Sequence, residues 1–360
     1  MRASDLDWSM GSRASVLLDW ATAAETARRV GGPGLRTGPV ERATIREDLA
    51  ERVGTAESLV TDFAGLSVPG SRSRAWVMSR SEWSAANLRA LQRLLDPLAE
   101  RLVPEGKGRS EIRRKALGAQ LGALLGYVSR KVLGQYDVFL PPDDEGLLYF
   151  VGPNVIEAER RFVLAPRDFR LWIALHEVCH RVQFGGTPWL KPLLSKLIDG
   201  YLGTIEVDPK VMRQQLRKAI DEVRAGADWR GASALLLLMS DEQRELFHRM
   251  QAVMSLLEGH ASFVMNEVAR ERVADLGRMR RSLKERRQAG GVEKAFQRAI
   301  GFESKVMQYD AGERFVRACV DAAGIAGFNL VWSDEANLPT TEEIAEPRRW
   351  LARVPGVSGG

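Results

Sequence analysis

The chain has 360 residues, is 45% hydrophobic and 28% charged, and carries a formal net charge of only +5, which is typical of a folded globular protein rather than a disordered tail. Its longest apolar runs, at 171–175 and 234–239, are far shorter than the roughly 20 residues of a bilayer span, and the N-terminus lacks the apolar stretch of a secretory signal, so we expect a cytoplasmic protein with no membrane partner. The one dense basic stretch, "RMRRSLKERRQ" at 278–288, has none of the aromatic residues of a nucleic-acid surface, so we expect a solvated helix end and no nucleic-acid partner.

Helical patterns dominate the chain, with apolar residues recurring every three or four positions and with proline and glycine in the breaks. The predicted helices cover 13–30, 40–64, 82–103, 110–134, 168–184, 190–202, 208–225, 240–274 and 292–323. Short segments rich in aromatic and branched residues stand at 136–140 and 147–152, joined by a turn of proline, aspartate and glycine, with a third at 161–165. We therefore predict a small sheet that leads directly into the helix over 168–184.

That helix carries the most informative stretch of the sequence, "WIALHEVCHRVQF" at 172–184, in which His176, Glu177 and His180 fit the pattern HExxH. Residues four apart on a helix are separated by about 40° around the axis and about 6 Å along it, so both imidazoles can hold one metal ion. Glu177 lies about 100° from His176, where a carboxylate can face a metal-bound water without binding the metal. The spacing predicts a zinc hydrolase. Burying these groups without a metal would cost several kcal/mol.

A catalytic zinc site needs a third protein ligand. The metzincin extension of the motif fails, because Gln183 and Gly186 stand where its glycine and third histidine would be. The best candidate segment is "MSLLEGHASFVMNEV" at 254–268, in a helix that opens with a capping box at Ser240. Helical geometry places Glu258 about 80° to one side of its apolar stripe and His260 about 80° to the other, so it cannot choose between them. We favour Glu258, which is close to a glycine that lets another backbone approach, and keep His260 as the alternative.

The chain resembles a family of bacterial, largely actinobacterial, zinc-dependent metalloproteases of unknown physiological role, some of them associated with biosynthesis of the deazaflavin coenzyme. The resemblance runs through most of the chain, in the segments "LLDWATAAETARRVGGPG", "WSAANLRALQRLLDPL", "GAQLGALLGYVSRKVLGQYD", "RDFRLWIALHEVCHRVQF", "TPWL", "SLLEGHASFVMNEV" and "VMQYDAGERFVRACVDAAGIAGFNLVW". It implies a mainly helical, zincin-like fold with His176, His180 and Glu258 as zinc ligands and Glu177 as general base.

Two positions depart from the pattern of these relatives. Cys179 replaces a frequent threonine and fits the role of a small buried residue beside His176. Ser262, four residues after Glu258, stands where relatives often carry an aspartate that steadies a ligand histidine. Serine can form a hydrogen bond but adds no charge, so this change weakens the expectation of strong catalysis and not that of the fold.

The expected mechanism is metal-assisted hydrolysis of an amide in a peptide or protein. Zinc lowers the pKa of its water, Glu177 accepts the proton, and a second donor stabilises the oxyanion, for which Tyr309 is the candidate. The alternative is a non-catalytic, zinc-stabilised binding or assembly protein linked to deazaflavin metabolism. Structural zinc sites are usually closed and rich in cysteine, which favours the enzyme. No GxGxxG follows a predicted strand, which disfavours a dinucleotide-binding oxidoreductase.

Taken together, the predicted fold is mainly α, of the α+β zincin-like kind, with a helical bundle around the HExxH helix and the small sheet just before it. We expect a flexible N-terminal segment over 1–12, a helical part over 13–135 and a metal-binding part over 136–355, the last two packed as one unit. The sequence does not indicate an oligomeric state.

Overall fold

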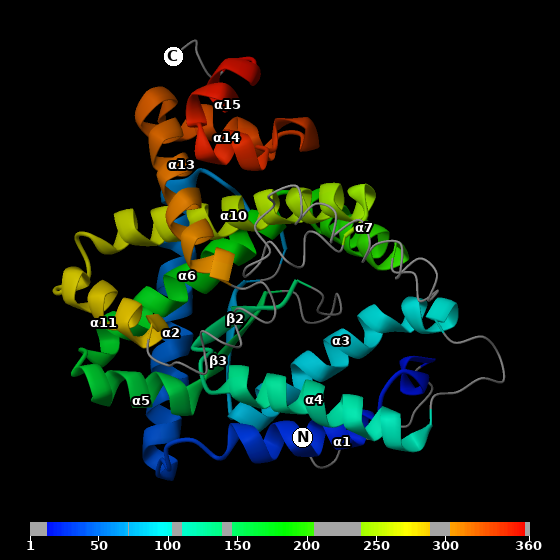
Figure 1. The fold of residues 1–360 in the computed structure, drawn as a ribbon. Coiled ribbons are helices and arrows are strands. Elements are labelled where there is room, and N and C mark those ends of the chain that lie inside the picture. The colour runs from blue at the N-terminus through cyan, green and yellow to red at the C-terminus, as the bar shows by residue number, and fades with distance from the viewer. Residues whose placement is uncertain are drawn as a thin grey trace. The chain divides into compact units, whose positions relative to one another are not determined.

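The computed structural model describes residues 13–70, 72–102, 110–138, 146–204, 239–288 and 303–356, and it consists mainly of helices with one three-stranded sheet (Figure 1). This confirms the predicted mainly α fold. The predicted flexible segment 1–12 and the predicted helix 208–225 lie outside the described residues. The chain divides into two compact units, Met1–Ser58 with Gly70–Arg181 and Leu59–Pro69 with Val182–Gly360. The packing of the sequence-defined parts 13–135 and 136–355 as one unit stays a prediction.

Two helices of the first unit continue into the second. The first unit contains the 3-10 helix η2 (Arg13–Val16) and the helices α1 (Trp20–Gly31), α2 (Pro39–Ala64), α3 (Arg80–Leu102), α4 (Glu111–Ser129), α5 (Gly152–Phe162) and α6 (Pro166–Gly186). Of these, α2 and α6 have their last residues in the second unit. The break between η2 and α1 arises because Asp19 caps α1, its carboxylate accepting a hydrogen bond from the Thr22 backbone N–H at 2.7 Å.

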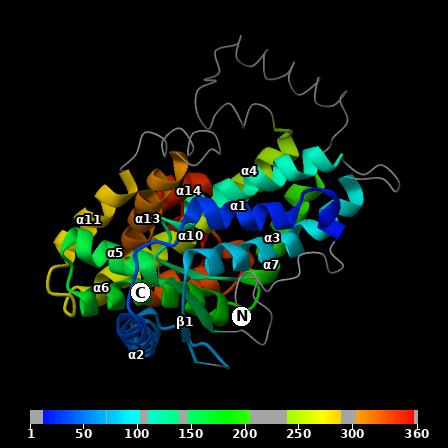
Figure 2. The same ribbon diagram turned by 90° about the horizontal axis from the view of Figure 1, so that it is seen from below.

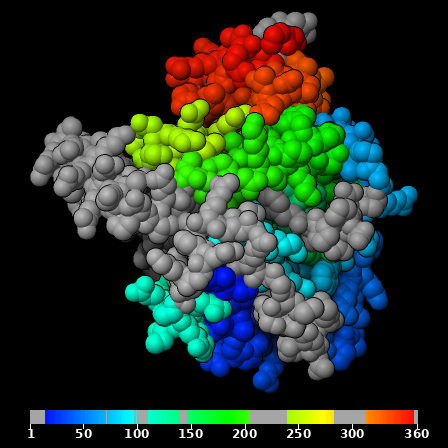
Figure 3. Space-filling view, turned by 90° about the vertical axis from the view of Figure 1, so that its right-hand side faces the viewer, coloured from blue at the N-terminus to red at the C-terminus, as the bar shows by residue number. Residues whose placement is uncertain are grey.

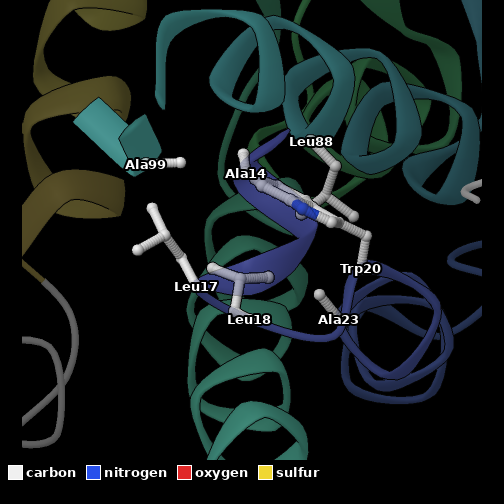
Figure 4. Packing of buried hydrophobic residues seen from close by; sticks show 7 residues of the cluster. All are labelled: Ala14, Leu17, Leu18, Trp20, Ala23, Leu88 and Ala99. Carbon is white, nitrogen blue, oxygen red and sulfur yellow. The ribbon is translucent and has the colours of Figure 1, made fainter. Parts of the chain in front are cut away.

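Helix α1 packs unusually closely on α4, and Figure 2 shows the two side by side. Gly118, Gly122 and Gly126 of α4 make this approach possible, since a Cβ on Gly122 would lie 2.2 Å from the carbonyl oxygen of Ala23. The apolar cluster at the start of the chain also uses α3. Figure 4 shows its buried members: Ala14, Leu17, Leu18, Trp20, Ala23, Leu88 and Ala99.

The sheet consists of β1 (Arg74–Met78), β2 (Gly134–Tyr136) and β3 (Leu147–Val151) in the order β1-β3-β2. Strand β1 runs parallel to β3, and β2 runs antiparallel to it. The sheet does precede the HExxH helix, as predicted, but two of its strands differ from the prediction. The segment predicted at 136–140 pairs at 134–136 instead, and β1 comes from a distant part of the sequence that we did not predict as a strand.

The third predicted strand, 161–165, is wrong. Residues 152–162 form helix α5, and Val163 ends it in the left-handed conformation (φ 51°), with its N–H donating to the Glu159 carbonyl. The branched and aromatic residues there therefore belong to a helix end. Composition alone does not distinguish a short apolar strand from a short apolar helix segment. Pro153 at the start of α5 fits the first turn of a helix, where its missing N–H costs nothing.

The two faces of the sheet contact different helices of the first unit. On one face, Asn87 of α3 and Gln135 of β2 exchange hydrogen bonds at 3.1 and 3.2 Å between their side-chain amides. On the other face, the neighbouring residue Gly134 lies against Glu177 of α6. Successive residues of a strand point to opposite faces, so β2 connects α3 with the HExxH helix.

The second unit contains the remaining helices. They are α7 (Leu190–Gly203), α10 (Asp241–Ala269), α11 (Leu276–Gln288), α13 (Glu303–Phe328), η4 (Asn329–Trp332), η5 (Glu335–Asn337), α14 (Thr341–Ala345) and α15 (Pro347–Arg353). The capping box predicted at the start of α10 is confirmed, with Ser240 and Gln243 bonded to each other's backbone N–H. Figure 3 shows α13, α14 and α15 as one orange-to-red group, in agreement with their mutual contacts.

Helices α10 and α13 cross at two glycines. A Cβ on Gly259 would lie 2.2 Å from the backbone carbon of Gly312, and one on Gly312 would lie 2.0 Å from the carbonyl oxygen of Ser255. The glycine next to Glu258 therefore does let another backbone approach, as the sequence suggested. Helix α13 later kinks at Gly324, where φ is 69°.

Among the described residues, one stretch, Ala311–Trp332, is long and apolar enough to cross a membrane by length and composition. One such stretch is weak evidence for a membrane span, because core helices of globular proteins pass the same test. It also includes the non-helical Gly324, so it is not one unbroken helix.

Candidate metal centre

Helix α6 carries the HExxH residues and is anchored on both sides of them within the first unit. Before the motif, Arg170 donates from Nε and Nη2 to the two carboxylate oxygens of Glu159 on α5, at 2.8 and 2.9 Å. Burial raises the pKa of Glu159, against the effect of these bonds, which favour its charged form. After the motif, Arg181 donates to Glu57 on α2 at 2.9 Å. The buried ion pairs thus fix the helix that presents the histidines.

The two histidines lie in the position that one metal ion requires. The Nε2 atoms of His176 and His180 are 3.3 Å apart, and the two rings are nearly perpendicular, with centroids 4.8 Å apart and an interplanar angle of 84°. Two nitrogens bound to the same tetrahedral zinc ion at about 2.0–2.1 Å are about 3.3–3.4 Å from each other. Both side chains are half-buried. The pair therefore fits a zinc ion without rearrangement.

Glu177 occupies a narrow space between α6 and the sheet. Its side chain is buried, and a Cβ added to Gly134 of β2 would lie 2.7 Å from both Cγ and Oε1 of Glu177. A glycine is thus needed at this position of β2 for the carboxylate to lie where it does. Sequence reasoning missed Gly134. The available signal was a glycine in the residues that begin the strand, which often marks a close approach of another group.

Helix α10 carries the candidates for the third ligand. Glu258 is half-buried, whereas His260 is only 1% exposed and is enclosed by aromatic rings. Its ring stacks on Phe328 at 5.5 Å between centroids and meets Trp332 edge-on at 5.2 Å. Its Nδ1 lies 2.9 Å from Nε2 of Gln183. His260 thus has the surroundings of a core histidine.

Among the described residues, His176, His180 and Glu258 form a group that could hold a metal ion. Two imidazoles and one carboxylate are the donor set of many hydrolytic zinc enzymes. With Glu177 next to His176 in the chain, the arrangement is suited to metal-assisted hydrolysis.

The sequence model of the zincin-like metallopeptidases matches residues 18–351, nearly the whole chain. The chain belongs to this family. It is also similar to a Chloroflexus aurantiacus protein, described from its crystal structure as a proposed hydrolase with a novel fold. The identity is 32%, the alignment covers 93% of this chain and 98% of the other, and the TM-score is 0.71. None of the curated proteins compared with the chain matches it.

Membership of the zincin-like metallopeptidase family implies a zinc cofactor and supports a metallohydrolase function. The donor group of His176, His180 and Glu258 agrees with both. The predicted bacterial origin and the link to deazaflavin metabolism rest on the sequence resemblance and stay predictions.

The remaining predicted residues of this zincin-like metallopeptidase lie on α6, α10 and α13. Ser262 is half-buried on α10, one turn after Glu258. Cys179 is buried on α6, as expected for a small residue beside His176. Tyr309 lies in α13, and its side chain is outside the described part of the structure. The roles assigned to the site residues stay predictions.

Proposed function

We propose that the protein is a zinc-dependent metallopeptidase that hydrolyses amide bonds in peptides or proteins. The observation that carries the proposal is the 3.3 Å separation of the His176 and His180 Nε2 atoms, which suits a tetrahedral ion, with Glu177 next in the chain. The family assignment points the same way. We place its activity in the cytoplasm, with no nucleic-acid or membrane partner.

In this proposal His176, His180 and Glu258 hold the zinc ion. When bound, zinc supplies a Lewis acid that polarises the substrate carbonyl and lowers the pKa of water. The three donors are half-buried, and three protein ligands with one open position for water or substrate make the usual catalytic zinc site.

Glu177 is the proposed general base. Its carboxylate accepts the proton of the attacking water and then delivers it to the leaving amine nitrogen, a role that typically contributes about 10²- to 10⁴-fold to the rate. The backbone of Gly134 lies against the carboxylate and restricts its position. We further propose that Ser262 steadies a ligand through a hydrogen bond and that Tyr309 donates to the oxyanion.

The competing function is a zinc-stabilised binding or assembly protein. Both functions predict bound zinc, so metal content alone does not distinguish them. The buried carboxylate of Glu177 favours the enzyme, because a purely structural site has no use for a base beside its ligands.

The test is digestion of a broad peptide library by the wild-type protein, followed by mass spectrometry. The protein is used as purified, after removal of metal with a chelator, and after addition of one equivalent of zinc. We expect cleavage that is lost with the metal and restored with zinc. Bound zinc without any cleavage would contradict the peptidase and favour the binding protein.

A further inference from the structure

Gln183 occupies a buried position near the end of α6 and connects this helix to α10. Its side chain is fully buried, and its Nε2 lies 2.8 Å from the backbone oxygen of Leu257 and 2.9 Å from Nδ1 of His260. All three residues belong to the second unit.

These two contacts determine the orientation of the amide and the tautomer of the histidine. The Leu257 carbonyl can only accept a hydrogen bond, so the amide group facing it must be the NH₂. The second hydrogen of the same NH₂ is then donated to His260, whose Nδ1 must be the acceptor and whose proton must lie on Nε2. Both N–H donors of Gln183 are therefore satisfied by α10. Two such bonds from one buried side chain fix the last turn of α6 against α10, both in its rotation about the helix axis and in its position along it.

The contacts of Gln183 lie next to the proposed ligands on both helices. On α10, Leu257 immediately precedes Glu258, and His260 follows it by two residues. On α6, Gln183 follows His180 by three residues, less than one turn or about 4.5 Å along the axis. Because α6 is one continuous helix from Pro166 to Gly186, any contact that fixes its last turn also fixes the turn that carries His180.

We propose that Gln183 is a positioning residue of the zinc site: its amide holds the ligand-bearing turns of α6 and α10 in the register that lets His180 and Glu258 bind the same ion. This inference rests on the proposed function, because it assumes that these residues bind zinc. His260 takes part in the same hydrogen-bonded group, as an acceptor for Gln183 and not as a zinc ligand. Residues that orient ligands typically contribute about 10- to 100-fold to metal affinity.

The test measures the zinc dissociation constant of folded variants by competition with a chromophoric chelator, together with the rise in Tm on addition of zinc. Gln183→Met keeps a similar volume but removes both donors. We expect its zinc affinity to fall by at least about 10-fold. His260→Phe keeps an aromatic ring in place but removes one acceptor, so we expect a smaller loss, of at least about 3-fold, since the bond to Leu257 remains.

Gln243→Met is the matched control. Gln243 also donates from Nε2 to a backbone carbonyl, that of Thr204 at 2.9 Å, but it lies at the start of α10, fifteen residues before Glu258. This variant should lower the Tm of the zinc-free protein and leave the zinc affinity unchanged. If Gln183 had a purely structural role, Gln183→Met would likewise lower the Tm of the zinc-free protein and leave the zinc affinity unchanged.

The outcomes separate this inference from the proposed function. If the wild type binds zinc and Gln183→Met binds it equally tightly, the inference fails and the proposed function stands. If the wild type binds no zinc, both fail. If Gln183→Met does not fold, the zinc affinity of His260→Phe decides. A zinc affinity equal to that of the wild type contradicts the positioning role. A loss of zinc affinity as large as that in Glu258→Ala would make His260 a ligand.

Discussion

The close contact between Glu177 and Gly134 is the residue-scale feature that matters most for the proposed chemistry. The carboxylate lies so near the β2 backbone that no side chain fits between them. A base must be within hydrogen-bond reach of the proton that it removes, and a displacement of about 1 Å in a catalytic group can cost about 10²-fold in rate. In the proposed mechanism, Gly134 therefore contributes by having no side chain, which leaves the Glu177 carboxylate its position.

Gly134→Ala tests this role. The added methyl would lie 2.7 Å from Oε1 of Glu177, so the carboxylate must move. We expect turnover to fall by about 10- to 100-fold with zinc content unchanged, because the histidines are not touched. Gly54→Ala is the control: apart from its chain neighbours and the nearby backbone of its own helix, no atom lies within 4 Å of the added Cβ, and an alanine in the middle of α2 should be neutral for turnover and slightly stabilising. Equal turnover in both variants would contradict the role of Gly134.

At the scale of elements, the sequence predicted the long helices best, because the apolar spacing continues over many turns in them. The helices that carry His176, His180 and Glu258 were predicted with starts near those of α6 and α10, because their apolar spacing is regular and, for α10, a capping box marks the first turn. The sheet was less predictable, because its strands are three to five residues long and β1 pairs with β3 across more than 65 residues of sequence. No local pattern encodes such a pairing. The contacts of Gly134 with Glu177 and of Gln183 with α10 also join segments distant in sequence, so local patterns do not predict them either.

The N-terminal cap of α1 gives a pH-dependent prediction. The hydrogen bond from the Thr22 N–H, assisted by Arg114 and Lys115, lowers the pKa of Asp19 in the folded protein. Its stabilising effect is therefore complete above the unfolded pKa of about 3.9 and is lost as the pH falls through the lower folded pKa. In urea unfolding, Asp19→Ala should lose about 1 kcal/mol of unfolding free energy at pH 7, and the difference from wild type should shrink below about pH 4.

Asp19→Asn is the control for the charge. Asparagine also caps helices but does not titrate, so its difference from Asp19→Ala should not change with pH. A difference between wild type and Asp19→Ala that stays constant down to pH 3 would contradict the assigned pKa shift.

At the scale of the whole molecule, the single donor group found among the described residues predicts about one zinc ion per chain. Zinc that binds only the folded protein stabilises it, by about 2.7 kcal/mol at a free concentration one hundred times the Kd. Removal of the metal should therefore lower the Tm, and Glu258→Ala should abolish most of this difference. Elemental analysis after chelator-free purification and thermal unfolding with and without zinc measure both quantities. A Tm that does not respond to zinc would contradict the site.

Glu177→Gln tests the central claim, that this zincin-like metallopeptidase is an active zinc peptidase, most directly. The substitution preserves the volume and hydrogen bonding of the side chain and removes the base. The measurement is the rate of cleavage of the peptide library by equal amounts of zinc-loaded wild type and variant, with the chelated protein as blank. We predict that the variant keeps its zinc and its Tm and loses about 100-fold or more in turnover. Cleavage at the wild-type rate by Glu177→Gln would contradict the mechanism, and the absence of cleavage by the zinc-loaded wild type would contradict the peptidase itself.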